Sequence, residues 1–157
     1  ARDGTVPSLV KVDAERYKLV NDNHGHLVGD ELLREIAASI RRSLLRPGDL
    51  ASRYGGEEFA IVLPGTDSAG TRVIAERIRK VVEATSVPLP DGSRLSATVS
   101  IGGATAHIGA TARVETLVRR ADEALYLAKG RGRNCAVLLD GLGAESRVAG
   151  TQGLLYI

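Results

Sequence analysis

Two adjacent glutamates at the bend of a short hairpin are the residues of this chain best suited to chemistry. They lie in the run Gly55-Gly56-Glu57-Glu58-Phe59, between apolar stretches at 50–54 and 59–63 that each have the pattern of a strand. The glycines permit a sharp turn and a close approach by a ligand. Neighbouring carboxylates repel each other unless a cation lies beside them, and protein-bound Mg²⁺ commonly keeps phosphate oxygens as ligands. The run predicts a magnesium and phosphate site, although a polar hairpin facing water would have the same pattern.

A third carboxylate, Asp13, ends the strand pattern of residues 9–13. In open α/β sheets ligands bind outside the carboxyl ends of strands. A hairpin tip beside this end would bring Glu57 near Asp13, so that two acids from separate elements share one metal. The alternative is an ordinary aspartate at a strand end.

A polar loop, Asn21-Asp22-Asn23-His24-Gly25-His26, precedes a helix that we expect to open at Gly29-Asp30. On local grounds Asp30 is an N-cap and Asn21 a turn residue. The two histidines that flank Gly25 do not favour zinc, because no cysteine pair and no His-x₃-His spacing accompanies them.

A cationic segment, Lys129-Gly130-Arg131-Gly132-Arg133, follows the last strong helix pattern. Cations at a helix C-terminus complement the helix dipole, which is the structural interpretation. The functional interpretation is a flexible arm, spaced by glycines, that contacts phosphates. The chain contains no Gly-x₄-Gly-Lys-Ser/Thr motif, so it is not a P-loop enzyme.

The elements that must position these residues alternate between strand and helix periodicity, which favours a single α/β domain. The expected strands are 9–13, 50–54, 59–63, 95–106 and 135–139. The expected helices are 15–20, 32–44, 69–82 and 117–128. We expect the domain to cover residues 1–140, and the tail at 141–157 has no assignable pattern.

Composition narrows the function further. The chain has 157 residues, 43% hydrophobic and 25% charged, and a formal net charge of only +2, so we expect no nucleic-acid partner. The single Cys135 lies in an apolar run, where we expect it to be a small buried hydrophobe, and it fits a reducing compartment. Because no signal peptide and no membrane-length apolar run occurs, we expect a cytoplasmic domain, whose longer parent could be membrane-anchored.

Ordered motifs along most of the chain, from about Leu9 to Leu139, point to one family. They are Val12-Asp13-Ala14-Glu15-Arg16-Tyr17-Lys18, Asn21-Asp22, Gly25-His26, Gly29-Asp30, Gly55-Gly56-Glu57-Glu58-Phe59, Ala75-Glu76-Arg77-Ile78-Arg79, Thr98-Val99-Ser100-Ile101-Gly102, Ala121-Asp122-Glu123-Ala124-Leu125-Tyr126 with Ala128-Lys129, and Gly132-Arg133-Asn134. In these motifs the chain resembles the GGDEF domains, the diguanylate cyclases. The resemblance implies a ferredoxin-like palm with a mostly antiparallel central sheet flanked by helices, related to nucleotidyl cyclases. It also implies condensation of two GTP into cyclic di-GMP with release of pyrophosphate.

Family roles map onto this chain by position. The resemblance implies that Asp13, Glu57 and the carbonyl of Ala14 bind Mg²⁺ or Mn²⁺. It further implies catalytic roles for Glu57, Glu58 and Lys18, phosphate contacts from Lys18, Lys129 and Arg133, and guanine recognition by Asn21 and Asp30. Whether Glu58 assists the metal or the deprotonation stays open.

A regulatory site is also implied. Arg46-Pro47-Gly48-Asp49 fits the family's Arg-x-x-Asp inhibitory site for cyclic di-GMP, and Arg77 matches a second arginine of that site. The alternative is that this segment is only a helix end and a turn. Because each domain binds one GTP, the resemblance implies a transient homodimer during catalysis and an upstream sensory or dimerising domain in a longer parent.

Three departures from the family pattern stand out: Glu15 replaces a common second aspartate, Tyr17 is the aromatic of the same stretch, and the family's upstream helix and Asp-x-Leu-Thr turn are not in this sequence. Two other function classes stay open. One is a GGDEF-like module that senses GTP or cyclic di-GMP without catalysis, which the intact acids disfavour. The other is a protein-interaction domain without a nucleotide ligand.

Overall fold

The computed structural model describes residues 7–106 and 114–139. Its elements in chain order are β1 (Ser8–Ala14), α1 (Tyr17–His24), α2 (His26–Ser43), β2 (Leu50–Gly55), β3 (Glu58–Leu63), α3 (Ser68–Glu83), β4 (Ser86–Pro88), β5 (Arg94–Ser96), β6 (Val99–Thr105), α4 (Val114–Gly130) and β7 (Ala136–Leu139). The expected strands at 9–13, 50–54 and 59–63 and the expected helices at 69–82 and 117–128 are confirmed. The expected tail at 141–157 lies outside the described residues.

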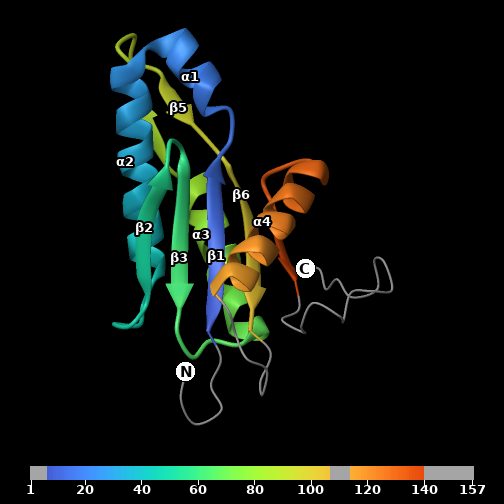
Figure 1. Cartoon of the computed structure of the whole chain (residues 1–157). Coiled ribbons are helices and arrows are strands. Elements are labelled where there is room, and N and C mark those ends of the chain that lie inside the picture. Colours follow the sequence, from blue (N-terminus) through green and yellow to red (C-terminus); the bar gives the residue numbers. More distant parts are fainter. Residues whose placement is uncertain (1–6, 107–113, 140–157) are drawn as a thin grey trace.

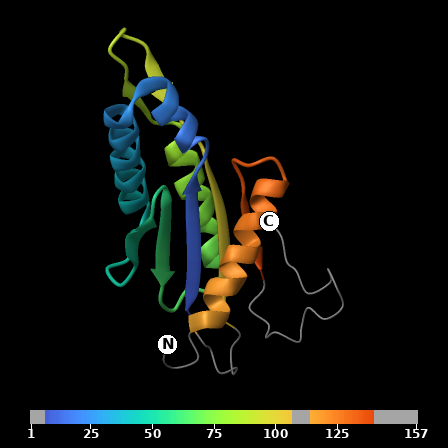
Figure 2. The same cartoon turned by 45° about the horizontal axis from the view of Figure 1, so that its top comes forward.

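The central sheet has the strand order β2-β3-β1-β6-β7. Only the pairing of β6 with β7 is parallel among its neighbouring strands in the described chain. Helices α2 and α3 cover one face of the sheet and α4 packs on the other (Figures 1 and 2). The expected mixed fold, a mostly antiparallel sheet flanked by helices, is therefore confirmed.

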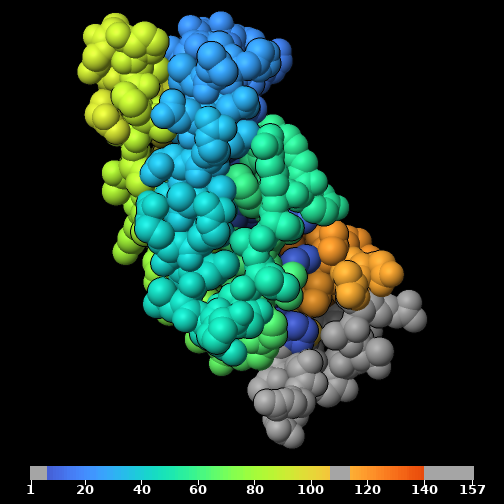
Figure 3. All heavy atoms as spheres, turned by 90° about the vertical axis from the view of Figure 1, so that its left-hand side faces the viewer, coloured from blue at the N-terminus to red at the C-terminus, as the bar shows by residue number. Residues whose placement is uncertain are grey.

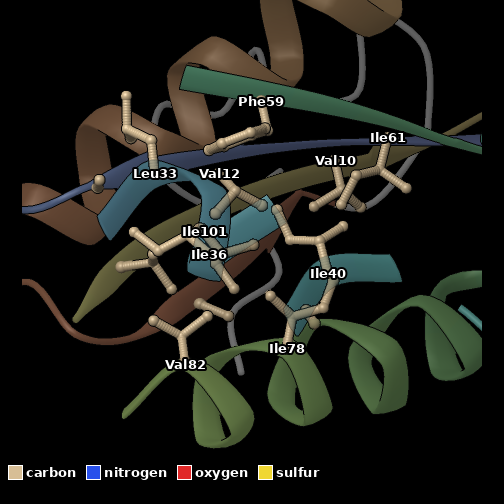
Figure 4. Close-up of a cluster of buried hydrophobic side chains, with 14 of the residues drawn as sticks. Val10, Val12, Leu33, Ile36, Ile40, Phe59, Ile61, Ile78, Val82 and Ile101 are labelled. Atoms are coloured by element: carbon tan, nitrogen blue, oxygen red, sulfur yellow. The ribbon is translucent and has the colours of Figure 1, made fainter. Parts of the chain in front are cut away.

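The main core lies between the sheet and the two helices of the first face. In Figure 4, Val10, Val12, Phe59, Ile61 and Ile101 project from three strands toward side chains of α2 and α3. The residues that α2 and α3 contribute at helical spacing are Leu33, Ile36, Ile40, Ile78 and Val82. Each fully buried aliphatic side chain stabilises the fold by roughly 1.5–3 kcal/mol, so this layer holds β1 and β3 firmly in register.

The opposite face depends on a close contact between α4 and β6. A Cβ atom at Gly102 would run into the backbone of Leu125, so only glycine lets α4 approach the strand this closely. The same helix packs its small residues Ala121, Ala124 and Ala128 inward. This contact fixes where α4 places its polar side chains along β1.

The first two helices differ from the expected pattern. The first helix begins at Tyr17 instead of Glu15, because Arg16 adopts a left-handed conformation with φ of 60°. The expected polar loop at 21–26 is also wrong: α1 continues to His24, and only Gly25, with φ of 88°, separates it from α2. As α2 starts at His26, Asp30 lies inside the helix and its interpretation as an N-cap is wrong.

The expected single strand at 95–106 divides into two. Residues 94–96 form β5, which pairs with β4 in a separate two-stranded sheet, and β6 begins only at Val99. The turn of this small hairpin contains Gly92, whose φ of 91° favours glycine.

In the described part of the chain, no helix combines the length and the apolar character that crossing a membrane requires.

Candidate active site

The hairpin tip lies against the end of β1, as the sequence predicted. Asp13 pairs in register with Glu58 across β1 and β3, and the Ala14 amide donates a hydrogen bond of 3.1 Å to the Glu57 carbonyl. Asp13 is buried, with 6% of its surface exposed, whereas Glu57 is half-buried in the turn. Two acids from separate elements thus meet at the C-terminal end of the central strand β1.

Two cations from the end of α4 and the following turn contact the acids at this end of β1. The Lys129 ammonium pairs with Asp13 Oδ2, and Arg133 Nε donates to Glu15 Oε1 at 2.8 Å. Glu15 also accepts a hydrogen bond from the Ser100 hydroxyl. We call Asp13, Glu15, Glu57, Glu58, Lys129 and Arg133 the strand-end cluster. It joins residues from β1, the hairpin and the α4 end.

The cationic segment continues directly from α4 and is held by backbone hydrogen bonds. Lys129 belongs to the last turn of α4, and the Arg131 and Arg133 amides donate to the Leu127 and Ala128 carbonyls. Arg133 has a left-handed φ of 66° and lines a hollow of about 510 Å³ between α1 and the 95–98 strand segment. Arg16 and Asn134, the other described non-glycine residues with positive φ, line it too. A left-handed φ costs energy in a residue other than glycine, so it persists only where the surrounding structure holds it. Such residues are common at active sites and ligand sites.

Burial and neighbouring charge act on the cluster in opposite directions. Burial raises the pKa of Asp13, the Lys129 ammonium counteracts this, and the charges of Glu57 and Glu15 raise it further, so that the net pKa lies above its usual value. Burial lowers the pKa of Lys129, but the hydrogen bond and charge of Asp13 outweigh it and leave that pKa raised. A second positive charge near Asp13 would therefore favour its ionised form.

The donor chemistry at this end of β1 fits a hard divalent cation. Asp13, Glu57 and the Ala14 carbonyl are oxygen donors, and Mg²⁺ is commonly held by one or two carboxylates plus substrate phosphates. Within the described residues no three His, Cys, Asp or Glu side chains gather into a ligand group. With Asp13 and Glu57 as two carboxylate donors, a Mg²⁺ ion would take its remaining ligands from substrate phosphates and water.

Sequence reasoning missed a buried lysine beside Glu58. Lys11 lies on β1 and its ammonium contacts Asp122 Oδ1 at 2.8 Å, Glu58 Oε1 at 3.3 Å and the Tyr54 ring at 3.9 Å from its centroid. Burial lowers the pKa of Lys11, but the hydrogen bonds and charges of Asp122 and Glu58 outweigh it and leave the pKa raised. One signal was available: residues 11 and 13 of a strand share a face, so Lys11 had to point toward the same side as Asp13.

A groove of about 370 Å³ runs between α2 and the hairpin. Figure 3 faces this side of the molecule and shows the hollow between the two elements. Asp30 lines it, over a mainly apolar lining that includes Leu33 and Phe59, together with three arginines, Arg34, Arg41 and Arg53. In such a groove the apolar side chains can pack against the face of a flat heterocycle while the carboxylate accepts hydrogen bonds from its edge.

Asn21, the other predicted base reader, lies on α1 close to the start of α2. Its Oδ1 atom is buried and has no hydrogen-bond partner among the described residues. A Cβ atom at Gly29 would run into this oxygen, so the glycine makes room for the amide. A buried acceptor without a donor costs roughly 1–3 kcal/mol, and such atoms gather at ligand sites.

The predicted phosphate contact Lys18 lies apart from the strand-end cluster. It projects from the first turn of α1 with 89% of its side chain exposed, and its ion partner is Asp22 at 3.9 Å. The structure therefore brings Lys129 and Arg133, but not Lys18, into contact with the acids at the end of β1.

The three predicted inhibitory residues lie around the loop after α2. Arg46 donates to the Thr66 hydroxyl at 2.7 Å, and Arg77 donates to the Ser43 carbonyl at 2.8 Å. Asp49 is buried and neither carboxylate oxygen has a hydrogen-bond partner among the described residues. Burial raises the pKa of Asp49, and the charge of Arg46 only partly counteracts this. We call Arg46, Asp49 and Arg77 the loop site.

Comparisons with known proteins agree with this geometry. Residues 1–135 match the family described as "Diguanylate cyclase, GGDEF domain". The chain is 44% identical over 136 residues to the response regulator PleD of Caulobacter vibrioides, covering 85% of this chain and 29% of that protein. It is 40% identical over 131 residues to diguanylate cyclase A of Treponema denticola, covering 83% of this chain and 34% of that protein. The chain thus spans about a third of the length of these relatives.

A solved structure is similar over a larger share of its own length. The GGDEF domain of DgcB from Caulobacter crescentus, in complex with c-di-GMP, superimposes with a TM-score of 0.78 at 34% sequence identity. The match covers 86% of this chain and 78% of that one. The expected fold is therefore confirmed by a close structural neighbour as well as by the sheet topology.

Proposed function

The chain belongs to the GGDEF family of diguanylate cyclases, and from that premise we propose that it condenses two GTP into cyclic di-GMP with release of pyrophosphate. One observation carries the proposal: the Gly-Gly-Glu-Glu hairpin holds Glu57 beside the buried Asp13 at the end of β1, with Lys129 paired to Asp13 and Arg133 paired to the neighbouring Glu15. Acids for a divalent cation and bases for phosphates therefore stand together, as phosphoryl transfer requires.

The reaction forms two phosphodiester bonds. The 3′-hydroxyl oxygen of one GTP attacks the α-phosphorus of the other, the bond from that phosphorus to the bridging oxygen of the β-phosphate breaks, and pyrophosphate leaves. The hydroxyl proton passes to a neighbouring carboxylate or to water, and the same step repeats in the opposite direction. Bound at Asp13, Glu57 and the Ala14 carbonyl, Mg²⁺ or Mn²⁺ would acidify the attacking hydroxyl and neutralise charge on the phosphates.

The chain's own residues bind and orient the triphosphate. Lys129 and Arg133 offer cations to the phosphates, where a fixed positive charge stabilises the charge that develops in the transition state. Lys18, on the exposed first turn of α1 and apart from the strand-end cluster, would be a further phosphate contact, as its position in the family motif implies. Both clustered cations already contact carboxylates, so phosphate shares them with Asp13 and Glu15.

Asn21 and Asp30 select the base. Guanine presents an N1–H and an exocyclic amine, and a carboxylate accepts hydrogen bonds from both, whereas adenine offers a mismatched edge. The Asn21 Oδ1 atom without a partner and the Asp30 carboxylate at the groove support this assignment. Sites that leave a buried polar group unpaired with the wrong ligand discriminate strongly.

Two domains must meet for turnover, because each binds one GTP and the product contains two nucleotides. The chain acts as a transient homodimer whose encounter an upstream sensory or dimerising domain would promote. The rate per molecule should therefore rise with protein concentration at saturating GTP. A constant specific rate, in samples that light scattering shows to be monomeric throughout, would contradict the two-domain mechanism.

Cyclic di-GMP also binds the loop site and inhibits the enzyme. The support is chemical: Arg46 and Arg77 are bidentate donors suited to phosphate or guanine, and the buried Asp49 has acceptors without donors. A guanine edge would supply two N–H groups to that carboxylate.

The deciding experiment is incubation of the 157-residue chain with GTP and Mg²⁺, followed by mass spectrometry of the products. We expect cyclic di-GMP and pyrophosphate, and no product from a Glu57→Gln control. Cyclic di-GMP that raises the melting temperature without any turnover by the wild type would support the sensor instead. Failure of GTP, GDP and cyclic di-GMP alike to raise it would support an interaction domain.

A further inference from the structure

Lys11 is an unusual residue at the centre of a sheet. Its side chain is 2% exposed, on β1, on the same face as Asp13. Lysine is almost never buried to this extent unless its charge is paired, because removing an ammonium from water costs several kcal/mol. The contacts that offset this cost therefore indicate what the residue does.

The partners of Lys11 come from three other elements. They are Glu58 on β3, the Tyr54 ring on β2 and Asp122 on α4. Asp122 is half-exposed and Tyr54 is largely exposed, so the ammonium is enclosed by side chains whose outer surfaces face solvent. Lys11 thus ties the hairpin to α4 through a single buried charge.

The register explains why Glu58 needs such a partner. Asp13 and Glu58 are direct neighbours across β1 and β3, where like charges repel. Lys11 pairs in register with Ala60, so Glu58 is its diagonal neighbour and within reach of a long side chain. Lys129 contacts Asp13 while Lys11 contacts Glu58, so that each of the two opposed acids has its own cation.

We propose that Lys11 is a positioning residue that draws the Glu58 carboxylate along the strands toward Asp122 and away from the Asp13 carboxylate, so that of the two hairpin acids only Glu57 places its charge next to Asp13. The inference rests on the proposed cyclase function for its kinetic consequence and on geometry for the rest. It separates the two signature acids: Glu57 acts at the phosphates, and Glu58 is held by the buried lysine.

Helix α4 fixes both arrangements. Asp122 holds Lys11 from α4, and Lys129 holds Asp13 from about two turns further along the same helix. Because Gly102 allows α4 to pack tightly on β6, the backbone positions of Asp122 and Lys129 are fixed relative to the sheet. The position of α4 therefore sets both acids of the β1–β3 pair.

The test is Lys11→Met, which removes the charge and keeps the length of the side chain. A crystal structure of the variant should show the Glu58 carboxylate moved from its position next to Asp122, with the β1–β3 register unchanged. We expect kcat to fall about tenfold and KM for GTP to change less than about twofold, because small displacements of a catalytic group lower the chemical step. Lys80→Met, an exposed lysine on α3, is the matched control and should leave both constants unchanged.

A double-mutant cycle isolates the route through Glu58. In a Glu58→Gln background, Lys11→Met should change kcat less than about twofold, whereas a merely structural lysine would cost the same in both backgrounds. If Lys11→Met does not fold, Lys11→Gln, which keeps a donor and loses the charge, takes its place.

The structural result decides the proposal even if the wild type makes no cyclic di-GMP, a failure that would concern the proposed function alone. A Glu58 carboxylate that stays in place without Lys11, or equal losses of kcat in both backgrounds, would overturn it.

Discussion

Two buried aspartates, Asp13 and Asp49, lie near opposite ends of β2, and their surroundings differ in one respect: whether a cation or a donor pairs with the carboxylate. Asp13 pairs with Glu58 beside the hairpin tip that ends β2, and Asp49 directly precedes Leu50, where β2 begins. Burial raises the pKa of both. Lys129 pairs with Asp13, whereas the oxygens of Asp49 have no hydrogen-bond partner among the described residues.

The difference shows two ways to prepare a site for a charged ligand. Three of the four acids in the strand-end cluster contact a cation: Lys129 pairs with Asp13, Arg133 with Glu15, and the buried Lys11 with Glu58. Under the proposed function, GTP and its metal would redistribute these existing pairs. In the loop site the Asp49 carboxylate has no hydrogen-bond donor among the described residues, so under the proposed function cyclic di-GMP would supply the missing hydrogen bonds directly.

The largest expected effect on turnover comes from a substitution in the strand-end cluster. Glu57→Gln keeps the shape and removes the charge beside Asp13, so we expect turnover to fall at least about a thousandfold, in the range seen when an essential group is removed. Initial rates of cyclic di-GMP formation measure it, with Glu31→Gln, an exposed acid on α2, as the matched control. Thermal melting should show an intact fold. A near wild-type rate would mean that Glu57 binds no metal.

The next effect tests the loop site. Arg46→Ala removes a guanidinium next to Asp49, and hydrogen bonds to charged groups contribute about 1.5–3 kcal/mol, so cyclic di-GMP should bind the loop site about 10- to 100-fold more weakly. Titration calorimetry measures this, and Arg72→Ala on the exposed side of α3 is the control. Product also fits the guanine readers of the active site, so an unaltered isotherm would move the whole binding there.

The third prediction concerns the groove between α2 and the hairpin, which Asp30 lines. Asp30→Ser removes the carboxylate that lines it, and bidentate contacts to a base contribute roughly 1–3 kcal/mol of discrimination. We expect the preference for GTP over ATP in kcat/KM to fall by about 5- to 100-fold, while Glu31→Gln leaves it unchanged. Should the preference survive intact, Asp30 would not read the base.

The smallest effect concerns stability. Asp49→Asn removes a buried charge without a donor, so the free energy of unfolding at pH 7 should rise by about 1 kcal/mol, which corresponds to a melting temperature higher by about 2–4 °C. Cyclic di-GMP should at the same time bind more weakly. Calorimetric melting and titration measure the two, and destabilisation by Asp49→Asn would show that the carboxylate has a partner in the fold.

The pH dependence of this gain follows from the sign of the shift. The pKa of Asp49 is raised in the folded protein, so protonation stabilises the native state below the ordinary value near 3.8, and this contribution is lost as pH rises through the raised pKa. At neutral pH the wild type carries the full penalty. The difference in melting temperature between Asp49→Asn and wild type should therefore shrink as the pH falls from neutrality toward 4.

Much of the fold was readable from the chain because its causes are local. The hairpin follows from two glycines between apolar stretches, and α3 and α4 follow from apolar residues at helical spacing. The errors were local conflicts that sequence patterns do not resolve. Gly25 alone separates α1 from α2, Arg16 delays the helix by a left-handed φ, and residues 97–98 divide an alternating stretch into β5 and β6.

By itself the sequence determined the family and most of the elements, and it supplied the candidate functional residues, since each of these depends on neighbouring residues or on an ordered set of motifs. Only the tertiary structure decided which charges meet. Lys129 with Asp13, Arg133 with Glu15 and Lys11 with Asp122 each join residues more than a hundred positions apart. Such pairs depend on strand register and on how closely α4 packs against Gly102. Register and packing are set by the whole core, so no local pattern encodes them.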